Sequence, residues 1–191
     1  MKRRSAFKMT KRLFVIATEG RETEPRYFAE FNPERNGSFR LKILPNLQHK
    51  PSPLEVVKRL LEYQAQHRPG PDTEYWAVID RDAWTEDELR KARDLISQQV
   101  EHHLALSNPC FELWLWLHSH PNRPFADRHD CQRSLRRECR WFRDKSNYDI
   151  AELMPHVGDA CSRARAIDDE PDSPWPRHQG TRVYRLVEKL R

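Results

Sequence analysis

Two kinds of hydrophobic pattern alternate along the first two-thirds of the chain. Continuous apolar runs rich in β-branched and aromatic residues are typical of buried strands, and alternation of apolar with basic residues is typical of a half-exposed strand. These patterns predict strands at residues 13–17, 39–43, 75–79 and 103–106. Apolar residues that recur every three or four positions predict helices at residues 23–31, 53–68, 89–100 and 110–118.

Three polar residues are expected to cap these helices, because their side chains can accept hydrogen bonds from the free N–H groups of a first turn. Thr23 and Ser52 precede the first two helices. Asn108 precedes the fourth helix, in which Pro109 would be the first residue.

The alternation of strands and helices predicts an α/β fold with a mostly parallel sheet of about four strands. Parallel neighbours require crossover connections, and helices supply them on both faces of the sheet. In the last third, helical apolar stripes at 131–142, 150–167 and 183–190 predict helices. We therefore expect an α/β core at residues 11–120 and a helical extension at residues 121–191, packed together as one structural domain.

Composition narrows the class of protein. The 191 residues include 34 Lys plus Arg and 29 Asp plus Glu, a net charge of +5 that is compatible with a polyanionic partner. No apolar run approaches the roughly 18 residues of a membrane helix, so we expect a soluble protein. The four cysteines are widely spaced, which argues against a zinc ribbon or a disulfide framework and favours a reducing cytoplasm. Glycine-rich nucleotide-binding motifs are missing, so the chain is not expected to be an ATPase itself.

Acidic residues follow two of the predicted strands. Glu19 follows the first strand, and Asp80 and Asp82 follow the third. Glu112 lies in the first turn of the helix after the fourth strand. Because ligands of open parallel sheets bind at the carboxyl ends of the strands, we expect these acids to share one edge. Carboxylate oxygens suit Mg²⁺ or Mn²⁺, which would support chemistry on phosphates.

Structural roles compete with this interpretation. Aspartate at a strand end is also a common turn residue, and Glu112 could merely complement a helix dipole. His118 and His120 resemble a zinc pair, but they lack further ligands, and histidines at a helix end more often bind carbonyl groups. Ser107 and Cys110 are expected to pack or cap, since no nucleophile motif surrounds them.

Basic residues predict a second functional surface. Arg133, Arg136, Arg137 and Arg140, with Arg143, recur at helical spacing opposite an apolar stripe. Such a ridge could follow the phosphates of a nucleic acid. The alternative is a solvated face, or one that is paired with the acids at 168–170.

With these residues placed, the chain resembles the RloB-like family, whose members look like Toprim-fold proteins and are associated with phage-defence loci. The resemblance rests on Glu19-Gly20, Thr23-Glu24-Pro25, Tyr27-Phe28, Val78-Ile79-Asp80-Arg81-Asp82 and the run from Ser107 to His118, and more loosely on Asp144-Lys145-Ser146 and Thr181-Arg182-Val183. Its most specific part is Asn108-Pro109-Cys110-Phe111-Glu112.

The resemblance implies that Glu19 matches the Toprim glutamate, a general acid/base or metal ligand, and that Asp80 and Asp82 match its metal-binding aspartates. It also implies a toxic effector kept beside an ATPase partner. The sequence departs from the family around residues 45–53, which lack a glycine-rich loop, and at residues 175–180.

Together these observations predict a Mg²⁺-dependent nuclease that cleaves DNA or RNA in anti-phage defence. An oligomeric state is compatible with this prediction. Asp80 and Asp82 would hold the metal, Glu19 would bind it or relay a proton, and Glu112 would orient a ligand or a second ion. The alternative is a non-catalytic binding or regulatory subunit of an ATPase-containing complex. A third and weaker option is a nucleotide signal bound at the same edge.

Overall fold

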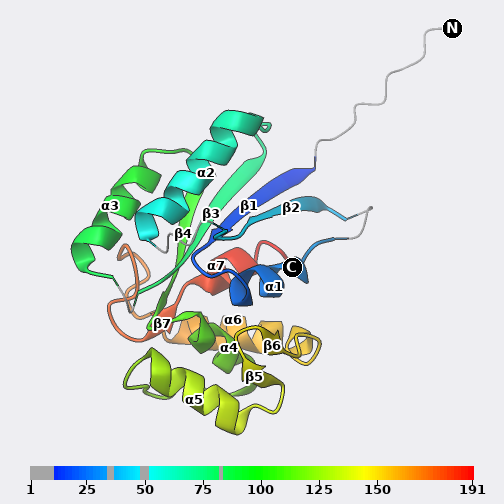
Figure 1. Cartoon of the computed structure of the whole chain (residues 1–191), viewed down its shortest axis with the longest axis vertical. Helices are drawn as coiled ribbons and strands as arrows, with labels where there is room; N and C mark the ends of the chain where they lie inside the picture. Colours follow the sequence, from blue (N-terminus) through cyan, green and yellow to red (C-terminus); the bar gives the residue numbers. More distant parts are fainter. Residues whose placement is uncertain (1–10, 34–36, 48–51, 82–83) are drawn as a thin grey trace, which may run out of the picture.

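The strands of the sheet are β1 (Arg12–Thr18), β2 (Phe39–Leu44), β3 (Thr73–Asp80), β4 (His102–Asn108) and β7 (Gly180–Thr181). They come from a computed structural model that describes residues 11–33, 37–47, 52–81 and 84–191. The order in the sheet is β2-β1-β3-β4-β7, as Figure 1 shows. The first four strands are parallel and β7 is antiparallel to β4, so the mostly parallel α/β sheet is confirmed. The fifth strand was not predicted, because two residues are too short to show a period.

Helices cover both faces of this sheet. They are α1 (Thr23–Ala29), α2 (Pro53–His67), α3 (Glu86–Ser97), α4 (Phe111–Ser119), α5 (Arg128–Glu138), the short 3₁₀ helix η1 (Met154–His156), α6 (Val157–Ala166) and α7 (Val183–Val187). α2 and α3 lie on one face, and α1, α4 and α7 lie on the other (Figure 1). None of the described helices is long and apolar enough to cross a membrane.

The sheet is buried on both faces, which explains why its central strands are continuous apolar runs. In β1, Val15 packs in the cluster beneath α2 and α3, whereas Phe14 and Ile16 pack in the cluster on the opposite face. The cluster that contains Phe14 and Ile16 also contains Leu135 of α5 and Leu186 of α7. One continuous core therefore joins the predicted α/β segment to the last third of the chain.

The last third is less helical than predicted. The stripe at 131–142 does not form one helix, because α5 ends at Glu138 and a hairpin of β5 (Phe142–Asp144) and β6 (Asn147–Tyr148) follows. Phe142 is buried as the stripe predicts, but it belongs to a strand and not to a helix. The stripe at 150–167 becomes helical only from Met154 onward, at η1 and α6, and α7 ends at Val187. Burial alone produced this periodicity, so it was a poor guide to conformation here.

One of the three predicted caps is confirmed. The Ser52 hydroxyl accepts a hydrogen bond from the N–H of Glu55 at 3.2 Å. Thr23 is the first residue of α1 instead, and its hydroxyl donates to the Lys145 carbonyl at 3.0 Å. Asn108 does not cap α4; its amide donates to the carbonyls of residues 176–178. Both corrections have one cause, since these polar groups bind distant loops rather than the nearest helix.

A buried ion-pair cluster fixes α7 and the loop before β7. The Asp168 carboxylate, whose side chain is 2% exposed, accepts hydrogen bonds from Arg182 at 3.1 Å, Arg185 at 2.9 Å and the Tyr184 hydroxyl at 3.0 Å. Burial alone would raise the pKa of Asp168, but the hydrogen bonds and the charge of Arg182 outweigh it and lower the pKa. The ionised carboxylate is therefore the form that the fold stabilises.

Asp168→Ala is expected to lower the free energy of unfolding by about 3–5 kcal/mol, because it leaves Arg182 buried without its counterion. Urea unfolding at neutral pH measures this loss. The neighbouring exposed variant Asp169→Ala is the control and should stay within about 0.5 kcal/mol of wild type. Equal stability of the two variants would show that the cluster is not a structural anchor.

Candidate active site

A cavity of about 320 Å³ opens at the carboxyl ends of β1 and β3, where α1 and α4 begin. The charged groups that line this acid pocket are the carboxylates of Glu19, Glu22, Glu24, Asp80 and Glu112 and the cations Arg21, Arg128 and Lys145. The structure thus brings together three of the four acids predicted from the sequence. The fourth, Asp82, lies outside the described residues.

Glu19 is held by the last residue of β3 and by Trp84. Its carboxylate accepts hydrogen bonds from the backbone N–H of Asp80 at 3.1 Å and from the indole N–H of Trp84 at 3.1 Å. Its own N–H donates to the Val78 carbonyl at 3.0 Å, and its carbonyl accepts from the Asn46 amide at 3.2 Å. These contacts orient the Glu19 carboxylate toward the end of β3.

Asp80, the last residue of β3, contacts the start of α4 and lies in the acid pocket. Its Oδ1 accepts a hydrogen bond from the N–H of Phe111, the first residue of α4, at 2.8 Å. It also lies among other acids, and burial together with the charges of Glu24, Glu112 and Glu19 raises the pKa of Asp80 well above its ordinary value. The contact with α4 positions this carboxylate without neutralising it.

Glu112 is the most deeply buried acid of the pocket, with 1% of its surface exposed. Its Oε1 accepts from the Lys145 ammonium at 3.1 Å and from the Gln132 amide at 3.2 Å. Its Oε2 is buried and has no hydrogen-bond partner in the described part of the chain. A buried carboxylate oxygen without a partner is costly, so this atom is available for a ligand of the pocket.

Glu24 belongs to the same acidic group, although the sequence did not single it out as a functional residue. It is 5% exposed, and its Oε1 accepts from the Gly20 N–H at 3.0 Å. Burial raises the pKa of Glu24, and the charge of Glu112 raises it further. A Cβ on Gly20 would lie 2.0 Å from Glu24 Oε2, so only glycine permits this approach. The available sequence signal was the Glu19-Gly20 and Thr23-Glu24-Pro25 pairing.

Lys145 reaches the pocket from the turn between β5 and β6. The Arg26 guanidinium donates to the Ser146 carbonyl at 2.9 Å, and the Tyr148 hydroxyl donates to the Thr23 carbonyl at 2.6 Å, so α1 holds the hairpin. Burial alone would lower the pKa of Lys145, but Glu112, Asp80 and Glu24 outweigh it and raise the pKa. The ammonium therefore remains charged beside the acids.

A comparison with protein families gives a match that covers nearly the whole chain. Residues 14–190 match the family model described as RloB-like protein. The chain belongs to the RloB-like family. No curated protein and no solved structure gives a significant match.

Two residues of this RloB-like chain that the sequence analysis considered, His118 and Ser107, have structural roles. His118 is buried, with Nε2 at 3.0 Å from the Tyr27 hydroxyl and Nδ1 at 2.9 Å from the Trp114 carbonyl, and burial lowers the pKa of His118 to about 4. Both ring nitrogens are engaged inside the core, which argues against a zinc pair with His120. The buried Ser107 hydroxyl lies 2.8 Å from that of Thr181 and so joins β4 to β7.

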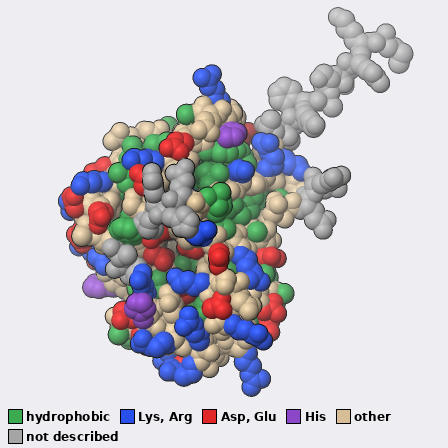
Figure 2. Space-filling model, in the orientation of Figure 1, with side chains coloured by type: hydrophobic (Ala, Val, Ile, Leu, Met, Phe, Trp, Pro, Cys, Tyr) green, Lys and Arg blue, Asp and Glu red, His purple; other side chains and the backbone are tan. Residues whose placement is uncertain are grey.

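Only part of the predicted arginine ridge lies on one helix. Arg133, Arg136 and Arg137 are exposed on α5, whereas Arg140 and Arg143 lie beyond its end. Arg133 pairs with Asp130 and Arg137 with Glu138, while Asp168 binds Arg182 and Arg185 instead. Figure 2 shows many basic side chains over the part of the molecule formed by α5 and the β5–β6 hairpin. Because α5 begins at Arg128, which lines the acid pocket, these cations extend from the site.

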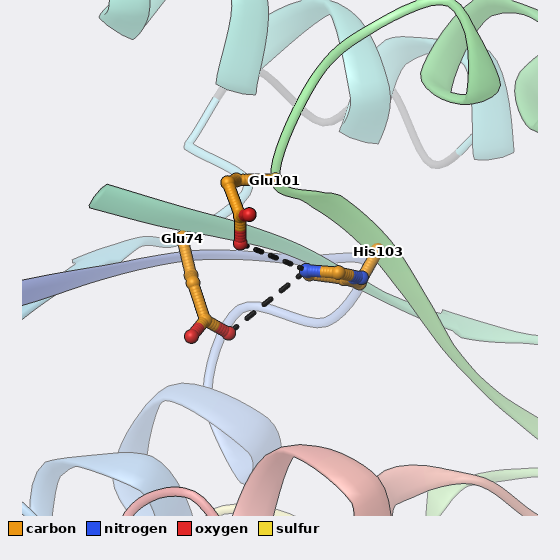
Figure 3. A group of neighbouring side chains, drawn as sticks. All are labelled: Glu74, Glu101 and His103. Atoms are coloured by element: carbon orange, nitrogen blue, oxygen red, sulfur yellow. Dashed lines mark ion pairs between the residues drawn. The ribbon is translucent and has the colours of Figure 1, made fainter. Parts of the chain in front are cut away.

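A second acidic group lies at the opposite end of β3. In the described residues, Glu74, Glu101 and His103 are the one set of three potential ligands whose donor atoms all lie within 4.8 Å (Figure 3). Glu74 is already paired with Lys189 at 2.8 Å and with Arg12 at 3.1 Å. Burial also lowers the pKa of His103. We interpret this group as an ion-pair anchor rather than a metal site.

Asp80→Asn is expected to stabilise the metal-free protein by about 1 kcal/mol at neutral pH. The raised pKa of Asp80 means that the folded state loses stability as pH rises from the unfolded value near 4 toward the folded value, and asparagine removes this loss while it can still accept from Phe111. Thermal unfolding in EDTA across this pH range measures the difference, which should shrink toward about pH 4.

The exposed variant Asp94→Asn is the control and should show no such pH-dependent gain. A variant Asp80→Asn that is less stable than wild type at neutral pH would mean that the ionised carboxylate is needed as a cap of α4.

Proposed function

We propose that this RloB-like chain is a divalent-metal-dependent nuclease that hydrolyses phosphodiester bonds of DNA or RNA, with a Toprim-like arrangement of its sheet and acids. The observation that carries the proposal is the buried, unpartnered Oε2 of Glu112 in a pocket that holds other carboxylates and three cations. A role as an effector in anti-phage defence, beside an ATPase partner, is part of the proposal and is supported by the family resemblance.

The donor set fits Mg²⁺ or Mn²⁺. Glu24, Asp80 and Glu112 offer only carboxylate oxygens, which hard divalent cations prefer. Glu19 lines the same pocket, and Asp82 follows Asp80 by two residues in the sequence. No three of the acids described in this pocket have donor atoms within 4.8 Å of one another. Such spacing is compatible with Mg²⁺, which keeps several waters and binds few carboxylates directly.

A bound divalent cation would supply Lewis acidity toward the phosphate and lower the pKa of a coordinated water. The chain itself supplies orientation and charge. Glu19, fixed by Trp84 and by the Asp80 N–H, is positioned to accept a proton at its carboxylate. Lys145 adds a positive charge over the reacting phosphate, where charge develops in the transition state.

The flanking cations account for substrate binding. Arg21 and Arg128 line the pocket and can contact non-bridging phosphate oxygens. Beyond them, Arg133, Arg136, Arg137 and Arg140 are exposed and can contact neighbouring phosphates. An electrostatic contact of this kind predicts binding that weakens as salt concentration rises.

Glu24→Gln and Glu112→Gln are each expected to reduce Mg²⁺-stimulated cleavage of mixed DNA and RNA by roughly 100-fold or more, because each removes a charge that holds the cation. They should also abolish the rise in melting temperature that Mg²⁺ or Mn²⁺ gives the wild type by linkage. Glu152→Gln, at an exposed position of the extension, is the matched control. A wild-type melting temperature that responds to neither metal would favour the regulatory-subunit alternative.

Lys145→Gln separates metal binding from catalysis. Its loss should lower the cleavage rate by roughly 100-fold, the scale for one group that stabilises transition-state charge, while metal-dependent stabilisation is kept. Lys145→Arg retains the charge and should restore part of the rate. Cleavage by Lys145→Gln at the wild-type rate would confine this lysine to neutralising Glu112.

A further inference from the structure

We propose that the groove between α2 and β2 binds a nucleobase of a single-stranded nucleic acid whose phosphate lies in the acid pocket. This base groove encloses about 470 Å³ and is lined on one side by the end of β2 and the residues after it, and on the other by the last turns of α2. The inference rests on the nucleic-acid substrate of the proposed function and identifies its strandedness.

The groove exists because β2 is an edge strand and α2 packs on the adjacent strand β1 and on β3 beyond it. The strip of β2 beside α2 is therefore left open. Leu47 is 71% exposed there, and Tyr63 is only partly buried. In Figure 2, apolar side chains gather in this region, on the same face of the molecule as the basic side chains over α5.

The chemistry of the lining favours a base over a purely apolar ligand. The rings of Tyr63 and His67 are stacked on each other, with centroids 4.2 Å apart and planes 16° from parallel, so they form an aromatic stack in the last turns of α2. Lys42 and Arg59 add positive charge, and Glu62 is the one acid among the lining residues that the structure describes. Aromatic surfaces combined with cations are the usual means of binding single strands without sequence preference.

Direct contacts connect the groove to the acid pocket. Arg59, which lines the groove, donates to the carbonyl of Thr18 at 2.6 Å and to that of Leu44 at 2.9 Å. Thr18 immediately precedes Glu19, whose own carbonyl accepts from Asn46. A chain that leaves the acid pocket across the ends of β1 and β2 therefore arrives at the groove within a short distance.

The depth of the acids explains why the strand must be single. Glu112 is 1% exposed and Glu24 is 5% exposed, so a phosphate has to enter a recess to approach them. In a duplex, stacked and paired bases hold each phosphate in line on the outside of a stiff helix, and removing a nucleotide from that stack costs a few kcal/mol. An unpaired strand can turn its phosphate inward and place its base in the groove without that cost.

The test measures binding of short fluorescent oligonucleotides by anisotropy in EDTA, where cleavage cannot interfere. The double variant Leu47→Ala with Tyr63→Ala should bind single strands about tenfold more weakly and duplexes as the wild type does. Val100→Ala, which truncates an apolar residue that is 82% exposed outside the groove, is the matched control and should have no effect. Tyr63→Phe keeps the ring and should bind like the wild type.

Abasic oligonucleotides make the assignment specific. Removing the base that occupies the groove should weaken binding to the wild type by the same factor, and should have no further effect on the double variant. Unchanged affinity of the double variant, or an equal loss for duplexes, overturns the proposal. So does a loss of self-association in sedimentation with oligonucleotide affinity unchanged, which would assign the groove to contact between two copies.

The binding test of the base groove and the cleavage test of the proposed nuclease can fail independently. Coupling between the groove and the base without any metal-dependent cleavage would reject the nuclease and keep the base groove. Cleavage that depends on Glu112 without such coupling would reject the base groove alone.

Discussion

Repulsion between carboxylates buried in one recess is the constraint on which the rest of the site depends. Burial raises the pKa values of Glu24 and Asp80, and the charges of the neighbouring carboxylates raise them further. A fold that only had to be stable would not gather these groups. The Lys145 ammonium and the N–H donors of Gly20 and Phe111 offset part of this repulsion. These contacts leave the buried Glu112 Oε2 without a hydrogen-bond partner in the described part of the chain, and the proposed cation would bind there.

This constraint also explains why the last third of the chain is integrated with the sheet. The β5–β6 hairpin delivers Lys145 and is held by the start of α1 through the Tyr148 hydroxyl. Gln132 of α5 binds the same Glu112 oxygen as Lys145, and Arg128 of α5 lines the pocket. At the other end of the sheet, Lys189 pairs with the buried Glu74 of β3. The extension therefore completes the acid pocket and also closes the core.

The sequence predicted those parts of the molecule that local patterns determine. Buried strands and their order of alternation followed from continuous apolar runs, and Glu19, Asp80 and Glu112 followed from the rule that strand ends meet at one edge. Glu24 was missed because an acid in a first turn is already explained by the helix dipole. Lys145 and the hairpin were missed because their roles depend on contacts more than 100 residues apart in sequence, such as Thr23 with Lys145. The prediction of a helix at Phe142 was wrong, because the spacing of buried residues there does not reflect helix geometry.

Binding of a divalent cation in the acid pocket is required by the proposed nuclease, and anomalous scattering from a crystal soaked in Mn²⁺ measures it. We expect a manganese peak in the recess, within coordination distance of at least one carboxylate of Glu24, Asp80 and Glu112. A peak at Glu74, Glu101 and His103 alone, or no peak in a well-occupied soak, would contradict it.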